Sequence, residues 1–459
     1  MATPMSRPIL RLLTLLLAAA LLATACGDDS GDSADADEPT TTTSTTTTAP
    51  SDDGGDETTT TTTKPIVLTD SFRGVTAETI KIGVVAPDLE SLRGLVDLDH
   101  GSYEAAYRAV IADVNANGGI LGRQIEVVVE TYLPIGTESA DEICSRFVDD
   151  EQVFAVIGGL LGDTPLCYTE LNDTIFVGSG QNDSRMARAT APWFTGLRNA
   201  DESARVIING FHERGFFDGA AVAVVAEVGD VALVEDVALP LLDDLGVNVV
   251  DVDFIEAVLI DDTATDAEVG LMAERQELEN ADTILTIGGA GPRYAGGIEE
   301  LGYRPRIVTT SLGSLRGYIR DRGGRDFSVL ADSAAGNTAE QLGWWADNAI
   351  QECIALVEAA TGETILDPNT RGPQEPENIV SVASACRNVR LFAAIAEAAG
   401  GDLTNDTFGA AGESLGEFHI PGLGMGNYGP DSPDGDAPIY LYEWNEDIED
   451  LESDGTVLG

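Results

Sequence analysis

Short apolar runs and helix-spaced apolar stripes alternate along most of this chain. The run Thr79–Ala86 predicts a strand that ends in a loop at Pro87. Apolar residues then recur at the spacing of one helix face, at Tyr103, Ala106, Tyr107, Val110, Ile111 and Val114. Asn117-Gly118-Gly119 ends that helix, and strand and helix signals continue in the same order to 174–177. Repeated strand–helix units predict a parallel sheet with helices on both faces.

The alternation stops at Phe194–Arg198 and then restarts, which predicts a second lobe. Its strands are expected, with helices between them, at 221–226, 247–255, 283–287 and 306–310. Two longer helices are expected at 342–360 and 378–399, and a last strand at 439–442. Two successive series of similar size predict an α/β protein with two doubly wound, Rossmann-like lobes built on parallel sheets.

The N-terminus carries the pattern of an export signal. Arg7 and Arg11 precede an apolar stretch that runs to Ala25 and is too short to span a membrane. Cys26 follows directly, and the segment resembles the lipobox of bacterial lipoproteins, although Ala23 stands where that motif usually has Leu, Val or Ile. We therefore expect export and anchoring to the outer face of the membrane through an acylated Cys26. The alternative is an ordinary signal peptide with an incidental cysteine.

Residues 27–64 are rich in Thr, Asp and Ser and poor in apolar groups. Such a segment cannot bury enough apolar surface to offset its ordering entropy. As a flexible chain it would span about 35 Å on average. We interpret it as a tether between the membrane and the folded body.

The chain is strongly acidic. It has 79 acidic and 25 basic residues in 459, and the only lysines are Lys64 and Lys81. Binding to nucleic acid is therefore not expected, because phosphate backbones require a basic surface. Apolar residues make up 43% of the chain, which is enough for a sizeable core.

Four cysteines remain after Cys26. In an exported protein an even number suggests disulfides, and four cysteines allow three pairings. Sequence order favours Cys144–Cys167 and Cys353–Cys386, each between helices that are neighbours in the chain. Buried free thiols are the alternative. Metal binding is not expected, because there is no CxxC spacing and the three histidines are scattered. No cofactor is expected either.

Three segments resemble a known family: Val75–Gly83, Asn115–Arg123 with its Asn-Gly-Gly-Ile-Leu-Gly-Arg sequence, and Gly426–Pro430 leading to Tyr440–Trp444. Over about residues 75–447 the chain resembles the type I periplasmic solute-binding proteins, in the branched-chain amino-acid-binding group that serves ABC importers. The cysteine pattern also resembles members that tie the second and third helices of the first lobe together.

The resemblance implies two lobes joined by a three-strand hinge, which trap a small polar or amino-acid-like ligand by closing. It also implies a monomer that delivers ligand to a membrane permease. The predicted parts are a signal peptide at 1–25, a tether at 26–74, first-lobe segments at 75–197 and 331–408, and second-lobe segments at 198–330 and 409–459.

Ligands of open α/β sheets bind beyond the carboxyl ends of the strands. The candidate ligand-binding residues in those loops are Asp88, Ser91, Gly162, Asp163, Thr164, Ser179, Gln181, Glu227, Ala290, Gly291 and Ser311. The chain departs from the family where Asp163, Ala290 and Ser311 replace a serine, an aromatic residue and an acid. Leucine, isoleucine or valine is therefore not carried over as ligand. A cationic group on the ligand would suit Asp163, Glu227 and Asp230.

Three other functions compete with solute import. A ligand sensor of the same fold would pass its closure to a signalling partner instead of a permease. An exported enzyme is not expected, because no credible nucleophile, base or metal set is present. The GxGxxG sequence at 424–429 follows Pro421-Gly422 and opens no helix, so it predicts a turn rather than a dinucleotide site. The Thr-rich spacer would also suit a structural or adhesive surface protein.

Overall fold

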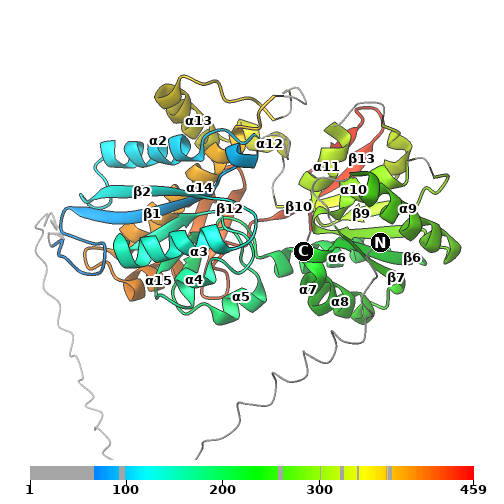
Figure 1. Ribbon diagram of the computed structural model, residues 1–459, viewed down its shortest axis with the longest axis horizontal. Helices are drawn as coiled ribbons and strands as arrows, with labels where there is room; N and C mark the ends of the chain where they lie inside the picture. The colour runs from blue at the N-terminus through cyan, green and yellow to red at the C-terminus, as the bar shows by residue number, and fades with distance from the viewer. Residues whose placement is uncertain are drawn as a thin grey trace, which may run out of the picture. The chain divides into compact units, whose positions relative to one another are not determined.

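The computed structural model describes residues 67–92, 99–256, 262–299, 301–320, 325–338, 341–368, 370 and 375–458. The predicted signal peptide, Cys26 and the tether as far as residue 66 lie outside the described residues. The chain forms two α/β lobes, each around its own sheet (Figure 1).

The first sheet has five strands within the described residues, and every neighbouring pair is parallel. In spatial order they are β2 (Gln124–Tyr132), β1 (Thr79–Pro87), β3 (Ala155–Gly158), β4 (Ile175–Gly178) and β5 (Trp193–Phe194). The central strands are wholly buried apolar runs, as expected for a parallel sheet that is covered on both faces.

Helices cover both faces of this sheet (Figure 1). One face carries α2 (Tyr103–Ala116), α13 (Asn348–Thr361), α14 (Ile379–Ala399) and α15 (Asn405–Glu413). The other carries α3 (Glu138–Ser145) and α4 (Leu166–Thr169). Ser102 caps α2 by accepting a hydrogen bond from the Ala105 amide. Helix α14 is long and apolar enough to cross a membrane, but its apolar side chains are buried in the first-lobe core.

The second sheet has eight strands within the described residues. Along its main path they are β14 (Asp450–Glu452), β13 (Ile439–Asn445), β10 (Ala334–Asn337), β9 (Arg306–Thr309), β8 (Thr283–Ile287), β6 (Ala221–Glu227) and β7 (Asn248–Ile255), and β15 (Val457–Leu458) pairs with β13. Strands β6 to β10 are parallel, and β13 joins them antiparallel. The two-lobed, mainly parallel α/β fold predicted from the sequence is therefore confirmed.

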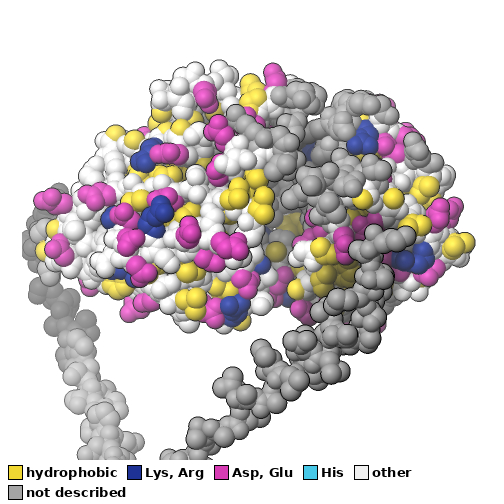
Figure 2. Space-filling view, in the orientation of Figure 1, with side chains coloured by type: hydrophobic (Ala, Val, Ile, Leu, Met, Phe, Trp, Pro, Cys, Tyr) yellow, Lys and Arg dark blue, Asp and Glu magenta, His cyan; other side chains and the backbone are white. Residues whose placement is uncertain are grey.

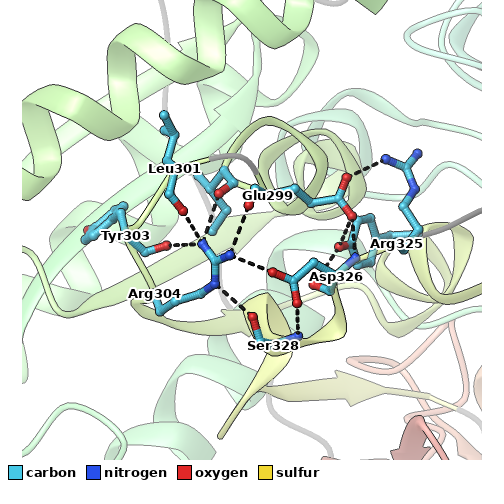
Figure 3. A network of polar contacts seen from close by, with 9 residues as sticks. Glu299, Leu301, Tyr303, Arg304, Arg325, Asp326 and Ser328 are labelled. Atoms are coloured by element: carbon cyan, nitrogen blue, oxygen red, sulfur yellow. Dashed lines mark hydrogen bonds and ion pairs between the residues drawn. The ribbon is translucent and has the colours of Figure 1, made fainter.

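Helices cover both faces of the second sheet as well. One face carries α6 (Ala200–Glu213), α7 (Val231–Leu233) and α8 (Leu239–Asp244). The other carries α9 (Asp262–Leu278), α10 (Gly291–Gly297) and α11 (Leu312–Arg320). A polar network ties the loop after α10 to the segment before β10 (Figure 3). In it Arg304 donates to the Leu301 carbonyl and pairs with Asp326, while Glu299 pairs with Arg325.

Sequence patterns missed strands β10, β11 (Gly416–Ile420) and β12 (Gly424–Tyr428). Strand β10 has the sequence Ala-Ala-Gly-Asn, without the β-branched residues that indicate a strand. Gly336 is required there, because a Cβ on it would lie 2.4 Å from the Ile207 side chain. The hairpin β11–β12 is likewise rich in glycine, and its Ile420 and Tyr428 pack into the first-lobe core.

The single helix predicted at 342–360 is two helices, α12 (Gln341–Ala346) and α13. Asp347 separates them, because its Oδ1 accepts hydrogen bonds from the amides of Ala349 and Ile350 and so caps α13. Trp344 and Trp345 of α12 pack against the first-lobe core.

The chain passes between the two sheets three times: after β5, after β10 and between β12 and β13. The first and third passages are tied together. The Thr195 amide donates to the Pro433 carbonyl at 3.1 Å, and the Tyr428 hydroxyl donates to the Thr195 carbonyl at 2.9 Å. The Asn199 amide donates to Asp434 at 2.6 Å.

Both disulfides favoured by sequence order are present, Cys144–Cys167 and Cys353–Cys386. The first joins α3 to α4, and the second joins α13 to α14. Cys353 and Cys386 are both buried in the first-lobe core.

The segment before β1 already belongs to the packed body. The Ser71 hydroxyl donates to the Leu403 carbonyl at 2.8 Å, and the rings of Phe72 and Phe154 are 6.2 Å apart. These contacts begin before the predicted start of the first lobe at residue 75. The other domain limits stay predictions.

Arg123, from the sequence motif Asn-Gly-Gly-Ile-Leu-Gly-Arg, is wholly buried. Its Nε donates to the Thr76 carbonyl at 2.7 Å, and its Nη2 donates to the carbonyls of Thr69 and Gly401 at 3.0 and 2.8 Å. The side chain therefore joins three separate stretches of the first lobe.

Acidic side chains are scattered over the visible face, with few basic ones among them (Figure 2). Many of the basic ones are paired with acids. Lys81, at the amino end of β1, pairs with Glu151 at 2.5 Å.

Candidate ligand site

The carboxyl ends of β1, β3 and β4 lie side by side, because these strands are parallel and in register. Val85 pairs with Gly158, and Gly158 pairs with Gly178. Gly158 has a φ of +146°, and a Cβ on it would lie 1.9 Å from the Val85 carbonyl oxygen. The close approach of the backbones at this edge of the sheet thus depends on glycine.

A pocket of about 250 Å³ opens at this edge, in the first lobe. Strand-end loops and the first passage between the lobes supply Ala86, Pro87, Tyr132, Gly159, Leu160, Leu161, Ser179, Gly196 and Leu197. Helices supply Tyr103, Trp344, Val380, Ala383, Ser384, Arg387 and Asn388. We call this space the apolar pocket, since most of its lining is apolar.

Arg387 is the one charged side chain among the described residues that line the apolar pocket. Its Nε donates to the Pro421 carbonyl at 2.7 Å, and its guanidinium lies 5.3 Å from the centre of the Trp344 ring. Burial lowers the pKa of the Arg387 guanidinium to about 10, so the group stays protonated at neutral pH.

Three polar side chains form a connected set beside Arg387. The Asn388 amide donates to the Tyr107 hydroxyl at 2.9 Å, and that hydroxyl lies 3.0 Å from the Ser384 Oγ. Burial raises the pKa of the Tyr107 hydroxyl, which stays protonated. Because it accepts from Asn388, it can donate to Ser384, and the Ser384 proton is then free for a ligand.

A larger polar pocket of about 670 Å³ adjoins the apolar pocket and shares Pro87 and Tyr103 with it. Asp88 lines this polar pocket. Its carboxylate accepts hydrogen bonds from the Ser91 hydroxyl at 2.5 Å and from the Ser91 amide at 3.0 Å. These hydrogen bonds lower the pKa of the Asp88 carboxyl. The structure therefore brings two predicted site residues, Asp88 and Ser91, into contact with each other.

The other predicted residues of the first lobe are spread over several places. Ser179 lines the apolar pocket. Gln181 is buried, and its side-chain amide donates to the Trp193 carbonyl. Gly162 is exposed, and the Thr164 hydroxyl donates to the Leu161 carbonyl. Of these residues, only Ser179 faces the apolar pocket.

Asp163 is paired within the lobe, with Arg185 at 3.0 Å and with Arg188 at 2.8 Å. The hydrogen bond from Arg185 lowers the pKa of the Asp163 carboxyl. A cationic ligand would have to displace these arginines, so the geometry does not favour the cation-binding role that the sequence suggested for Asp163.

The predicted residues of the second lobe lie at the carboxyl ends of β6, β8 and β9. Glu227 pairs with Arg293 at 3.1 Å, and the Ser311 Oγ lies 2.7 Å from the Ser314 Oγ. Ala290 and Gly291 are both buried, and Ala290 belongs to the second-lobe core. Glu227 is thus also neutralised by an arginine, and the ligand-binding roles of all these residues stay predictions.

Sequence patterns missed the helical side of the apolar pocket. Val380, Ala383, Ser384, Arg387 and Asn388 recur at the spacing of one helix face. Three polar residues on that face of an otherwise apolar helix were a usable signal, because buried polar groups need partners. The described residues hold no cluster of three His, Cys, Asp or Glu placed to bind a metal ion.

Replacing Asp230 with asparagine should raise the melting temperature at neutral pH. Burial raises the pKa of the Asp230 carboxyl above its ordinary 3.8, and the charge on Glu227 raises it further. The folded state then binds the proton more tightly than the unfolded state, so stability falls as pH rises through the window above 3.8. The gain from Asp230→Asn should be larger at pH 7 than at pH 4 in thermal melts.

Asp236→Asn is the control, since Asp236 is an exposed acid in the same lobe. It should leave the melting profile unchanged at both pH values. An equal gain from Asp230→Asn at the two pH values would contradict the electrostatic explanation.

The two-lobed fold, with a pocket at the carboxyl ends of parallel strands, defines a class of α/β proteins that bind small solutes. The family model for periplasmic binding proteins matches residues 79–450, and the chain belongs to the periplasmic binding protein family. Members of this family are substrate-binding proteins rather than enzymes, in agreement with the sequence analysis. Comparison with curated proteins finds no match.

Several solved structures share the fold at low sequence identity. A leucine-binding protein from Thermotoga maritima is 14% identical over 83% of this chain and 99% of its own, with a TM-score of 0.59. A solute-binding protein from R. palustris in complex with 4-hydroxybenzoate is 15% identical over 83% and 97%, with a TM-score of 0.60. A fatty acid ABC transporter substrate-binding protein from Thermomonospora curvata is 15% identical over 85% and 95%, with a TM-score of 0.58.

Proposed function

We propose that this chain is the solute-binding component of an ABC importer, held at the outer face of the membrane by an acylated Cys26. The observation that carries this proposal is the pocket at the carboxyl ends of β1, β3 and β4, in a chain of the periplasmic binding protein family. Relatives of the same fold are named for leucine, 4-hydroxybenzoate and fatty acids, which supports a small organic solute as ligand.

The proposed mechanism is closure of the two lobes around the solute. Three passages of the chain join the lobes, which is the connection that a hinge requires. Ligand contacts made by both lobes would favour the closed state over the open one. A permease then needs to recognise only the closed state, and the tether keeps the protein concentrated near that partner.

Saturating ligand should lower the radius of gyration of the protein in solution. The experiment uses a Cys26→Ser form, which keeps the whole chain but lacks the residue to be acylated. Thermal-shift screening first identifies solutes that bind, and small-angle X-ray scattering then compares the free and the saturated protein. A solute without a thermal shift is the control and should leave the radius unchanged. A saturated protein without compaction would contradict closure, and the absence of any binding solute would contradict the proposed function.

A further inference from the structure

The only charge in the described lining of the apolar pocket is positive, although the protein as a whole is very acidic. The chain has 79 acidic residues, yet none of the described residues that line this pocket is Asp or Glu. Arg387 supplies the one charge of the lining. A positive group on a mostly apolar wall contrasts with the face seen in Figure 2, where acidic side chains outnumber basic ones.

Arg387 is held in place by one neutral hydrogen bond and one cation–π contact, and the charge of Asp347 acts on it without an ion pair. The Pro421 carbonyl accepts from Nε, and the guanidinium carbon lies over the Trp344 ring, 5.3 Å from its centre. The two terminal nitrogens make no hydrogen bond to any residue that the structure describes, and no described carboxylate lies within ion-pair distance. A guanidinium at a largely apolar site gains from an anionic partner, so these two nitrogens are suited to a bidentate acceptor.

Arg390, one turn further along α14, shows the contrast. It pairs with Asp113 at 2.7 Å and does not line the pocket. The same helix thus presents one arginine in an ion pair and one that makes no ion pair with any described residue.

The remaining lining fixes the kind of molecule that fits. Ser384, Asn388 and Ser179 offer neutral hydrogen-bonding groups, and the other walls are mainly Leu, Val, Ala and aromatic side chains. The volume of about 250 Å³ is slightly below the range of ligand pockets, roughly 300 to 1,000 Å³, which favours a small molecule. A ring or a short hydrocarbon chain with one charged end matches this lining.

We propose that the apolar pocket takes an organic monocarboxylate with an apolar body, whose carboxylate is held by the two terminal nitrogens of Arg387. This inference rests on the proposed function and names the class of solute. The lining offers no acid for an α-ammonium group, so a zwitterionic amino acid is a poorer fit. It offers one cation, so a phosphate dianion would keep an uncompensated charge.

The test measures binding to the Cys26→Ser form by isothermal titration with three acid and amide pairs: benzoate and benzamide, hexanoate and hexanamide, octanoate and octanamide. At least one acid should bind, and its amide should bind at least about 30-fold more weakly, because the amide cannot pair with a buried charge. Arg387→Gln should lower the affinity for the acid by at least about 30-fold and bring the affinities for the acid and the amide close together. The affinity of Arg387→Lys for the acid should lie between those of the parent form and Arg387→Gln. Lysine keeps the positive charge but cannot make the two parallel hydrogen bonds of a guanidinium.

Arg390→Gln is the matched control and should retain the preference for the acid. The ratio of acid to amide affinity within one variant does not depend on the fraction of protein that is folded, so a destabilised variant still gives an answer.

Equal affinity for acid and amide in the parent form, or an unchanged ratio in Arg387→Gln, would overturn the inference. Binding of leucine or of a diamine, with no binding of any acid, would overturn this inference but keep the proposed function. No binding by any acid, amino acid or amine would overturn both.

Discussion

Replacing Arg123 with methionine should lower the free energy of unfolding by roughly 3–5 kcal/mol, because three carbonyls in part-buried hydrogen bonds would lose their donor. The Arg123 side chain is 0% exposed and donates to the carbonyls of Thr69, Thr76 and Gly401. Methionine keeps much of the length of the side chain but cannot donate. Urea unfolding followed by tryptophan fluorescence would measure the change.

Arg108→Met is the control for this prediction. Arg108 is 49% exposed and pairs with Glu104 one turn away on α2, so its loss should cost about 0.5 kcal/mol or less. A shift of the urea midpoint for Arg123→Met that is no larger than that for Arg108→Met would show that the three carbonyls find other partners.

Removing the disulfide Cys353–Cys386 by the double substitution to alanine should lower the free energy of unfolding by about 4 kcal/mol. The bond closes a loop with a sequence separation of 33 residues, and in the chain-entropy model a loop of this length restricts the unfolded chain strongly. Alanine is preferred to serine, because both cysteines are buried and alanine places no polar group there. Thermal and urea unfolding of the double variant would measure the loss.

The Cys144–Cys167 bond provides the comparison. Its sequence separation is 23 residues, so the matching double variant should lose slightly less stability. Reduction of the unsubstituted protein should reproduce the combined loss of both bonds. If the Cys353→Ala/Cys386→Ala variant unfolds at the same denaturant concentration as the unsubstituted protein, the chain-entropy argument fails for this bond.

Much of the fold is predictable from the sequence because parallel strands that are buried on both faces are continuous apolar runs. The run Thr79–Ala86 is an example, and all of it lies in β1. Strand β10 shows where this signal ends. Its small residues give no strand signal of their own, and it exists because β9 and β13 pair with it and because α6 needs a glycine beneath Ile207.

The candidate site is predictable only where it follows from sheet topology. The rule for strand ends directs attention to the loops after β1, β3 and β4, and Ser179 from one of these loops lines the apolar pocket. Arg387 was missed because it reaches the pocket from a helix more than 200 residues further along the chain. Asp163 looked available for a ligand because no sequence pattern could show that Arg185 and Arg188 fold back onto it.

The position of Lys81 near the amino end of β1 has a practical consequence. Lys64 and Lys81 are the only lysines of the chain, so a Lys64→Arg form would carry a single lysine. Lys81 lies near the amino end of β1, while Ala86 and Pro87 at the other end line the apolar pocket. Six residues of strand separate Lys81 from Pro87 by about 20 Å. Apart from the α-amino group of the chain, an amine-reactive fluorophore would therefore attach at one known position on the folded body, far enough from the pocket to report on the protein without occupying its site.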